Sequence, residues 1–135
     1  MATRSWIAYE EVDGVITSAY CHWDGYLEGV GYSLLKRYSS IDDAKTLVDG
    51  GDMSTLGDYY SKRKEEGVNT DPKIHYDREI LLEEFNKTWC DYLYLMNKEG
   101  QWEVYEKHGK KLFRQLIDAI NRIDEDEDEE NLSEH

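Results

Sequence analysis

A hairpin signal near the N-terminus constrains the fold of this 135-residue chain more than any other feature. Two β-prone runs, residues 6–9 and 15–22, flank Asp13-Gly14. This pair favours a tight turn because both residues tolerate positive φ angles. Side chains alternate between the two faces of a strand. The second run therefore has two faces, one with Ile16, Ser18, Tyr20 and His22 and the other with Val15, Thr17, Ala19 and Cys21.

Apolar residues at helical spacing predict four amphipathic helices. The first covers residues 27–38, although Gly29 and Gly31 near its start disfavour a helix and indicate close packing there. The second follows Ser40 as N-cap and ends at Gly50-Gly51. The third begins after Asp77, with Leu81, Phe85 and Trp89 on one face. The fourth lies within residues 109–123, with a stripe of Leu112, Leu116, Ile117, Ile120 and Ile123.

A second hairpin is predicted from residues 90–96 and 101–106, with a turn closed by Gly100. Two hairpins and about four helices indicate an α+β domain. We expect an antiparallel sheet built from the two hairpins, with the helices packed on one face. The predicted domain spans residues 1–123, and residues 124–135 form a disordered acidic tail because their composition cannot build a core.

The net charge of −14 is concentrated in that tail, which carries eight acidic residues and no Lys or Arg. The rest of the chain has 22 acids and 16 bases, a balance of −6. Direct nucleic-acid binding is disfavoured, because it requires an excess of basic residues. No apolar run reaches the roughly 20 residues that a membrane span needs, and the N-terminus lacks a secretory signal. We therefore expect a cytosolic protein with reduced Cys21 and Cys90.

The stretch from Asp58 to Lys73 lacks periodicity, and a loop of this length is often functional. Its tyrosines and basic residues suit a protein interface, so we predict partner contacts at Tyr59, Tyr60, Lys62 and Arg63. An ordinary solvent-exposed loop is the alternative. The acidic tail likewise has two interpretations, a solubilising appendage or a mimic of nucleic acid that competes for a basic surface.

Residues 19–26 gather a thiol, an imidazole, a carboxylate and three aromatic rings. A thiol nucleophile or a metal site is one interpretation, drawing on Cys21, His22, Asp24 and His75. However, adjacent strand residues point to opposite faces, so Cys21 and His22 cannot readily activate each other. The simpler interpretation is a buried Cys21, a hydrogen-bonded His22 and an Asp24 that caps the following helix.

Metal binding by His22, Asp24, His75 and Asp77 is not enforced by their spacing, so neither a metal nor another cofactor is predicted. Trp23 and Tyr26 complete the predicted partner-binding residues. No catalytic constellation is predicted beyond the alternative built on the thiol.

Several motifs resemble a widespread family of small proteins carried by tailed bacteriophages and prophages, whose members generally have no assigned function. They are Thr3-Arg4-Ser5-x-Ile7-x-Tyr9, Tyr20-Cys21-His22-Trp23-Asp24-Gly25-Tyr26-x-Glu28-x-Val30-Gly31-x-x-Leu34-Leu35-x-x-Tyr38, and Gly51-Asp52-x-Ser54-x-Leu56-Gly57. Tyr92-Leu93-Tyr94-Leu95 and Gly100-Gln101-Trp102 resemble the closing hairpin of that family. The chain departs from the family at Leu27, where relatives often have Pro. It also has His75-Tyr76-Asp77-Arg78 where they carry an Arg-Asp-Arg-type motif. The resemblance implies a phage protein in a bacterial cytoplasm, and it transfers no catalytic residues.

Together these observations predict a non-enzymatic phage accessory protein that binds and modulates a host protein. The expected partner is a defence, transcription or nucleic-acid-processing factor, with a basic surface where the mimicry interpretation applies. The alternative is a small thiol- or metal-dependent hydrolase that uses the Cys21-His22-x-Asp24 segment. The sequence makes no prediction of the oligomeric state.

Overall fold

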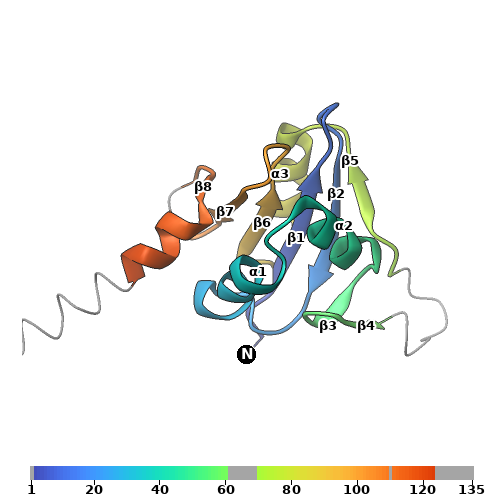
Figure 1. The fold of residues 1–135 in the computed structure, drawn as a ribbon. Coiled ribbons are helices and arrows are strands. Elements are labelled where there is room, and N and C mark those ends of the chain that lie inside the picture. Colours follow the sequence, from blue (N-terminus) through green and yellow to red (C-terminus); the bar gives the residue numbers. More distant parts are fainter. Residues whose placement is uncertain (1, 61–69, 110, 124–135) are drawn as a thin grey trace, which may run out of the picture.

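The computed structural model describes residues 2–60, 70–109 and 111–123, and the predicted acidic tail at 124–135 lies outside these ranges. The described residues form an α+β fold with one eight-stranded sheet in the order β4-β3-β2-β1-β6-β7-β8, and β5 pairs with β2 (Figure 1). The strands are β1 (Ser5–Glu10), β2 (Ile16–Cys21), β3 (Met53–Thr55), β4 (Asp58–Tyr59), β5 (Lys73–His75), β6 (Tyr92–Met96), β7 (Trp102–Glu106) and β8 (Arg114–Gln115).

The helices largely match the predicted positions. A π-helical turn, η1 (Leu27–Gly31), continues into α1 (Tyr32–Arg37), followed by α2 (Ile41–Asp49) and α3 (Arg78–Asn86). The predicted caps are confirmed, because Ser40 Oγ accepts from Asp43 N at 3.1 Å and Asp77 Oδ1 accepts from Ile80 N at 2.8 Å. A last helix covers residues 116–123.

The sheet is mixed rather than antiparallel. β1 pairs with β2 and β6 with β7 in antiparallel fashion, with positive φ at Gly14 and Gly100 in the turns. The two hairpins meet through a parallel pairing of β1 with β6. A parallel pairing requires a long crossover, and the chain between β2 and β6 supplies one. Three short strands, β3, β4 and β5, arise from stretches where the sequence predicted none.

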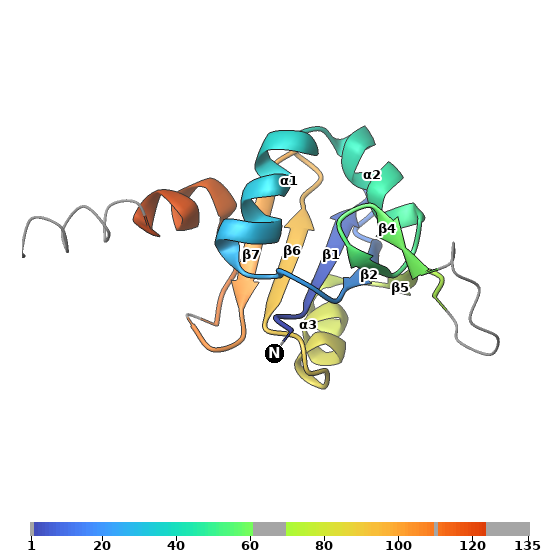
Figure 2. The same ribbon diagram turned by 90° about the horizontal axis from the view of Figure 1, so that it is seen from below.

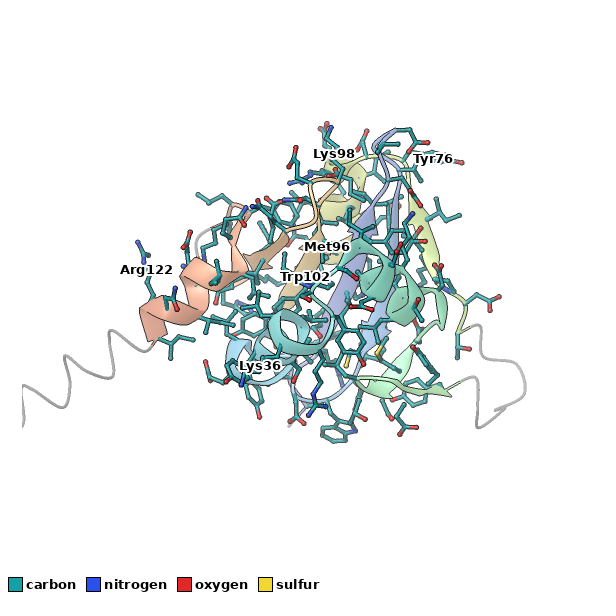
Figure 3. The ribbon with its side chains drawn as sticks, viewed as in Figure 1. Lys36, Tyr76, Met96, Lys98, Trp102 and Arg122 are labelled. Atoms are coloured by element: carbon teal, nitrogen blue, oxygen red, sulfur yellow. The ribbon has the colours of Figure 1, made fainter. Side chains whose placement is uncertain are left out.

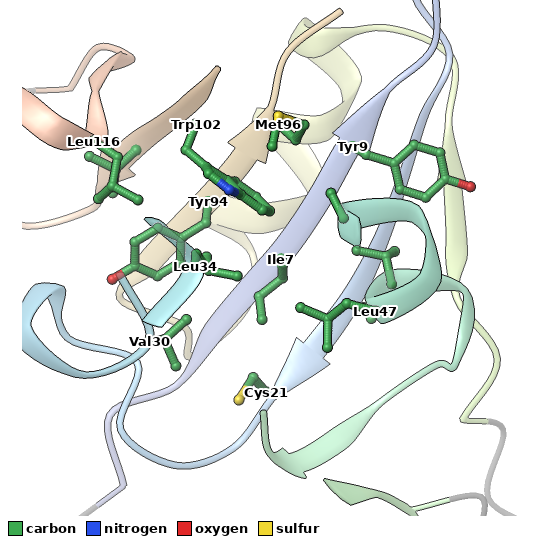
Figure 4. Packing of buried hydrophobic residues seen from close by; sticks show 14 of the residues in the cluster. Ile7, Tyr9, Cys21, Val30, Leu34, Leu47, Tyr94, Met96, Trp102 and Leu116 are labelled. Atoms are coloured by element: carbon green, nitrogen blue, oxygen red, sulfur yellow. The ribbon is translucent and has the colours of Figure 1, made fainter. Parts of the chain in front are cut away.

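Helices cover both faces of the sheet, which corrects the prediction that they share one face. Figure 2 shows α1 and α2 on one side of the strands and α3 on the other. Alternate residues of β1 enter the two cores: Ile7 and Tyr9 pack under α1 and α2, while Trp6 and Ala8 pack toward α3. Figure 4 shows the first of these cores. An uninterrupted buried run such as residues 5–9 is typical of a strand covered on both faces.

The predicted helix over residues 109–123 begins later than expected. Arg114 and Gln115 instead pair with β7 as β8, and Phe113 packs on the ring of Tyr105 at 5.7 Å between centroids. Leu112 and Ile117 are consequently exposed, whereas Leu116, Ala119, Ile120 and Ile123 pack against the first core. None of the helices formed by the described residues has the length and apolar character that crossing a membrane requires.

Candidate functional site

The segment after β2 forms a rigid corner before η1. His22 N donates to Met53 O at 3.1 Å and Trp23 N donates to Ser54 O at 2.9 Å, so β3 holds the chain as it leaves the sheet. Gly25 N donates to Thr3 O at 2.9 Å, and Gly25 O accepts from the buried Tyr94 hydroxyl at 2.6 Å. The corner is therefore fixed from both sides by backbone and tyrosine hydrogen bonds.

Close packing explains the two glycines at the start of the helix, as the sequence predicted. A Cβ on Gly29 would overlap the backbone oxygen of Asp24, which accepts from Val30 N at 2.8 Å. A Cβ on Gly31 would lie 3.2 Å from the ring of Tyr94. Asp24 does not cap the helix with its side chain, because its left-handed backbone (φ 60°) presents the backbone oxygen instead.

Cys21 is fully buried in the core under α1 and α2. Its thiol donates to Trp23 O at 3.6 Å, and burial raises the pKa of that thiol to about 12. The thiolate is the nucleophilic form of cysteine, so Cys21 is chemically inert at neutral pH.

The structure separates the histidines from Cys21. His22 directly follows β2, and its Nδ1 shares a 2.5 Å hydrogen bond with the hydroxyl of Tyr20, which packs on the face opposite Cys21. His75 also lies on that face, packed against Trp6 at 5.4 Å between ring centroids. The four residues of the hydrolase alternative are therefore not brought together. Among the described residues, no cluster of three or more His, Cys, Asp or Glu side chains has metal-binding geometry.

One polar constellation was missed from the sequence. Ser18 Oγ lies 2.7 Å from His75 Nε2, and His75 Nδ1 lies 2.7 Å from Glu84 Oε2 at an angle that falls short of a regular hydrogen bond. The order resembles a Ser-His-acid triad. However, Ser18 is only 2% exposed and His75 is fully buried, so no substrate reaches the hydroxyl. The group joins β2, β5 and α3 as a structural link.

The predicted partner-binding residues occupy different environments. Trp23 is 46% exposed and Tyr26 is 39% exposed. Tyr59 instead packs beside the first core and donates from its hydroxyl to Leu47 O at 3.0 Å. Tyr60 N donates to Asp52 O at 2.9 Å. Lys62 and Arg63 lie outside the described residues.

Trp23 and Tyr26 line a hollow of about 270 Å³, which we call the corner pocket. Its other walls include Asp24, Glu28 and Leu56, and none of the described residues that line it is basic. The Tyr26 hydroxyl lies 3.4 Å from Asp24 Oδ1, and the negative charge of Asp24 raises the pKa of that hydroxyl. The pocket thus combines aromatic faces with two carboxylates.

A second hollow of about 380 Å³ lies on the other side of Tyr26 and contains Asp91, Glu106 and His108. Here each carboxylate already has a partner, because His108 Nε2 lies 3.0 Å from Asp91 Oδ1 and Arg114 contacts Glu106. The corner pocket therefore has the greater unbalanced negative charge of the two.

Comparison with protein-family models, with curated proteins and with solved structures found no match for this chain. The assignment of function therefore depends on the geometry of the chain itself.

Proposed function

We propose that this chain is a non-enzymatic binding protein whose corner pocket receives a basic side chain from a partner protein. The observation that supports this most directly is the composition of the pocket, in which Trp23 and Tyr26 stand beside Asp24 and Glu28. Aromatic faces attract Arg and Lys through cation–π contacts, and carboxylates bind guanidinium groups through charge-assisted hydrogen bonds. An arginine satisfies both requirements better than a lysine because its planar group stacks and hydrogen-bonds together.

The charge of the whole chain supports the same partner chemistry. At −14 overall, the chain attracts a basic protein surface and repels nucleic acid. The resemblance of the corner motif to phage proteins supports a setting in an infected bacterium. In that setting the partner is a host protein, such as a nucleic-acid-processing or defence factor whose basic surface normally contacts nucleic acid. Binding there inhibits the host protein by occupying that surface.

Capture from extracts of infected host cells tests the proposal. The tagged full-length chain is compared with Trp23→Ala and with Asp24→Asn combined with Glu28→Gln, and bound proteins are quantified by mass spectrometry. We expect one basic protein to be retained by the wild-type chain and reduced at least about tenfold by either variant, the size of effect typical of interface hot spots.

Two matched variants complete the experiment. Tyr76→Ala removes another exposed aromatic residue, 76% exposed and pointing away from the body (Figure 3), and should leave capture unchanged. Cys21→Ala probes the thiol. Equal capture by the wild-type chain and both pocket variants would contradict the proposal. Loss of function in Cys21→Ala with the fold intact, together with a stoichiometric metal, would favour the hydrolase alternative.

A further inference from the structure

We infer that a second pocket, on the face of the sheet that carries α3, binds a small planar aromatic anion. This hollow of about 330 Å³, which we call the Trp89 pocket, is lined by Arg4, Trp6, Tyr20, Asp52, Lys73 and Trp89 among others. None of the described residues lines both this pocket and the corner pocket. Its volume falls within the range of small-molecule sites, at the lower end. The inference is independent of the proposed partner.

The side chain of Trp89 is exposed, although hydrogen bonds hold the backbone on both sides of it. The helical spacing of Leu81, Phe85 and Trp89 predicted a buried indole, but α3 ends at Asn86 and leaves Trp89 85% exposed. The Lys107 ammonium donates to Thr88 O at 2.5 Å, and Cys90 N donates to Thr88 Oγ1 at 3.2 Å. Because its backbone is fixed, the exposed indole of Trp89 offers a flat surface on which another ring can stack.

Packing and hydrogen bonds also fix the inner walls of the pocket, which are formed by Trp6, Tyr20 and Asp52. Trp6 packs against both His75 and Phe85, at 5.4 and 5.6 Å between ring centroids. Tyr20 N donates to Asp52 Oδ1 at 3.0 Å, so the Asp52 carboxylate already accepts a backbone hydrogen bond. A ligand ring therefore enters between preformed aromatic walls, with little ordering cost on the protein side.

The charges in the pocket point to an anion. Among the described residues that line the pocket, Arg4 and Lys73 outnumber Asp52, so this lining carries a net positive charge in a chain whose net charge is −14. Among the described residues, Arg4 Nε is buried and donates to no acceptor. Arg4 also lines the pocket, so an anionic oxygen bound there would compensate the charge of a guanidinium that lacks one of its acceptors.

These features define the ligand as one flat ring system with one anionic group. A nucleoside monophosphate and an aromatic carboxylate both have this chemistry. In either case the ring stacks on Trp89 and the anion lies between Arg4 and Lys73.

Isothermal titration of the full chain tests the inference with adenosine 5′-monophosphate and with indole-3-acetate as probes. We expect saturable binding of at least one probe with a Kd below about 1 mM, and at least about tenfold weaker binding of uncharged adenosine. Arg4→Gln and Trp89→Ala should each weaken binding by about tenfold or more. Binding of the nucleotide alone would identify phosphate as the anionic group, and binding of the indole acid alone would identify carboxylate.

Trp89→Ala keeps the test decisive even if Arg4→Gln destabilises the fold, because the indole is largely exposed. Tyr76→Ala and Lys36→Gln are the matched controls for loss of an exposed aromatic ring and loss of a positive charge, and should change affinity less than about twofold. The inference is overturned if neither probe binds, if adenosine binds as tightly as its monophosphate, or if Trp89→Ala binds like the wild-type chain.

Discussion

Ser18, His75 and Glu84 show how burial determines the role of single residues in this protein. Each comes from a different element, and His75 is enclosed by Trp6 on one side and by the Ser18 hydroxyl on another. Burial lowers the pKa of His75 below its usual value, and the neighbouring Glu84 carboxylate opposes this only in part. At neutral pH the imidazole is therefore uncharged, and it shares its hydrogen bond with Ser18 as a neutral group.

This pKa shift predicts a loss of stability on acidification. The unfolded chain binds a proton at its histidine near pH 6.5, whereas the folded chain binds it only at lower pH, so stability falls as the pH drops through that window. We expect His75→Gln to lose less free energy of unfolding than the wild-type chain between about pH 7.5 and about pH 5. Urea unfolding at both pH values measures this, and equal losses in the two proteins would contradict it.

At the scale of elements, Arg78 fastens the start of α3 to both hairpins. Its Nε donates to Glu10 Oε2 at 3.0 Å and its Nη2 donates to Glu103 Oε2 at 2.7 Å. The guanidinium also lies 5.1 Å from the ring centroid of Phe113. The hydrogen bonds from Arg78 to Glu10 hold the pKa of the Glu10 carboxyl below its usual value. One side chain thus joins β1, β7 and the segment before β8.

Arg78→Lys should therefore destabilise the fold although it keeps the charge. A lysine cannot form the forked hydrogen bonds to two carboxylates, so we expect a loss of about 1–2 kcal/mol, allowing for the partial exposure of Arg78. Thermal and urea unfolding provide the measurement. Lys45→Gln is the matched control, because it removes an exposed pair with Glu11 and should cost less than about 0.5 kcal/mol. An equal effect of both variants would argue against a special role for Arg78.

At the scale of the whole molecule, negative charge is unevenly distributed. Residues 124–135 contribute −8 of the net −14 and the remaining residues contribute −6. Long-range charge of this kind speeds the encounter with a basic partner, whereas close contacts determine how long the complex lasts. The tail and the corner pocket should therefore affect different rate constants.

Deletion of residues 124–135 separates the two contributions. We expect slower association with the captured partner and a weaker dependence of association on salt, while the dissociation rate stays within about twofold. Surface plasmon resonance at about 0.05 M and about 0.5 M NaCl measures both rates. Trp23→Ala should show the reverse pattern, with faster dissociation. Unchanged association after the deletion at both salt concentrations would remove the tail from the binding mechanism.

Part of the candidate sites could be predicted from the sequence. Trp23 and Tyr26 were expected at a partner surface, and the glycines at 29 and 31 indicated close packing at the corner. The Trp89 pocket was not predictable, because periodicity alone places Trp89 on the buried face of α3. The helix ends one turn earlier, and the backbone of the following residues turns the indole outward.

The sequence by itself determined the features that depend on a few neighbouring residues: the turns at Gly14 and Gly100, the caps at Ser40 and Asp77, and the alternation of side chains along β2. Only the tertiary structure decided the parallel pairing of β1 with β6, the coverage of both sheet faces and the meeting of Ser18 with His75. The physical reason is the distance along the chain between the residues that interact. A turn or cap follows from local backbone preference, whereas these arrangements join residues far apart in the chain, and their stability comes from burying surfaces together.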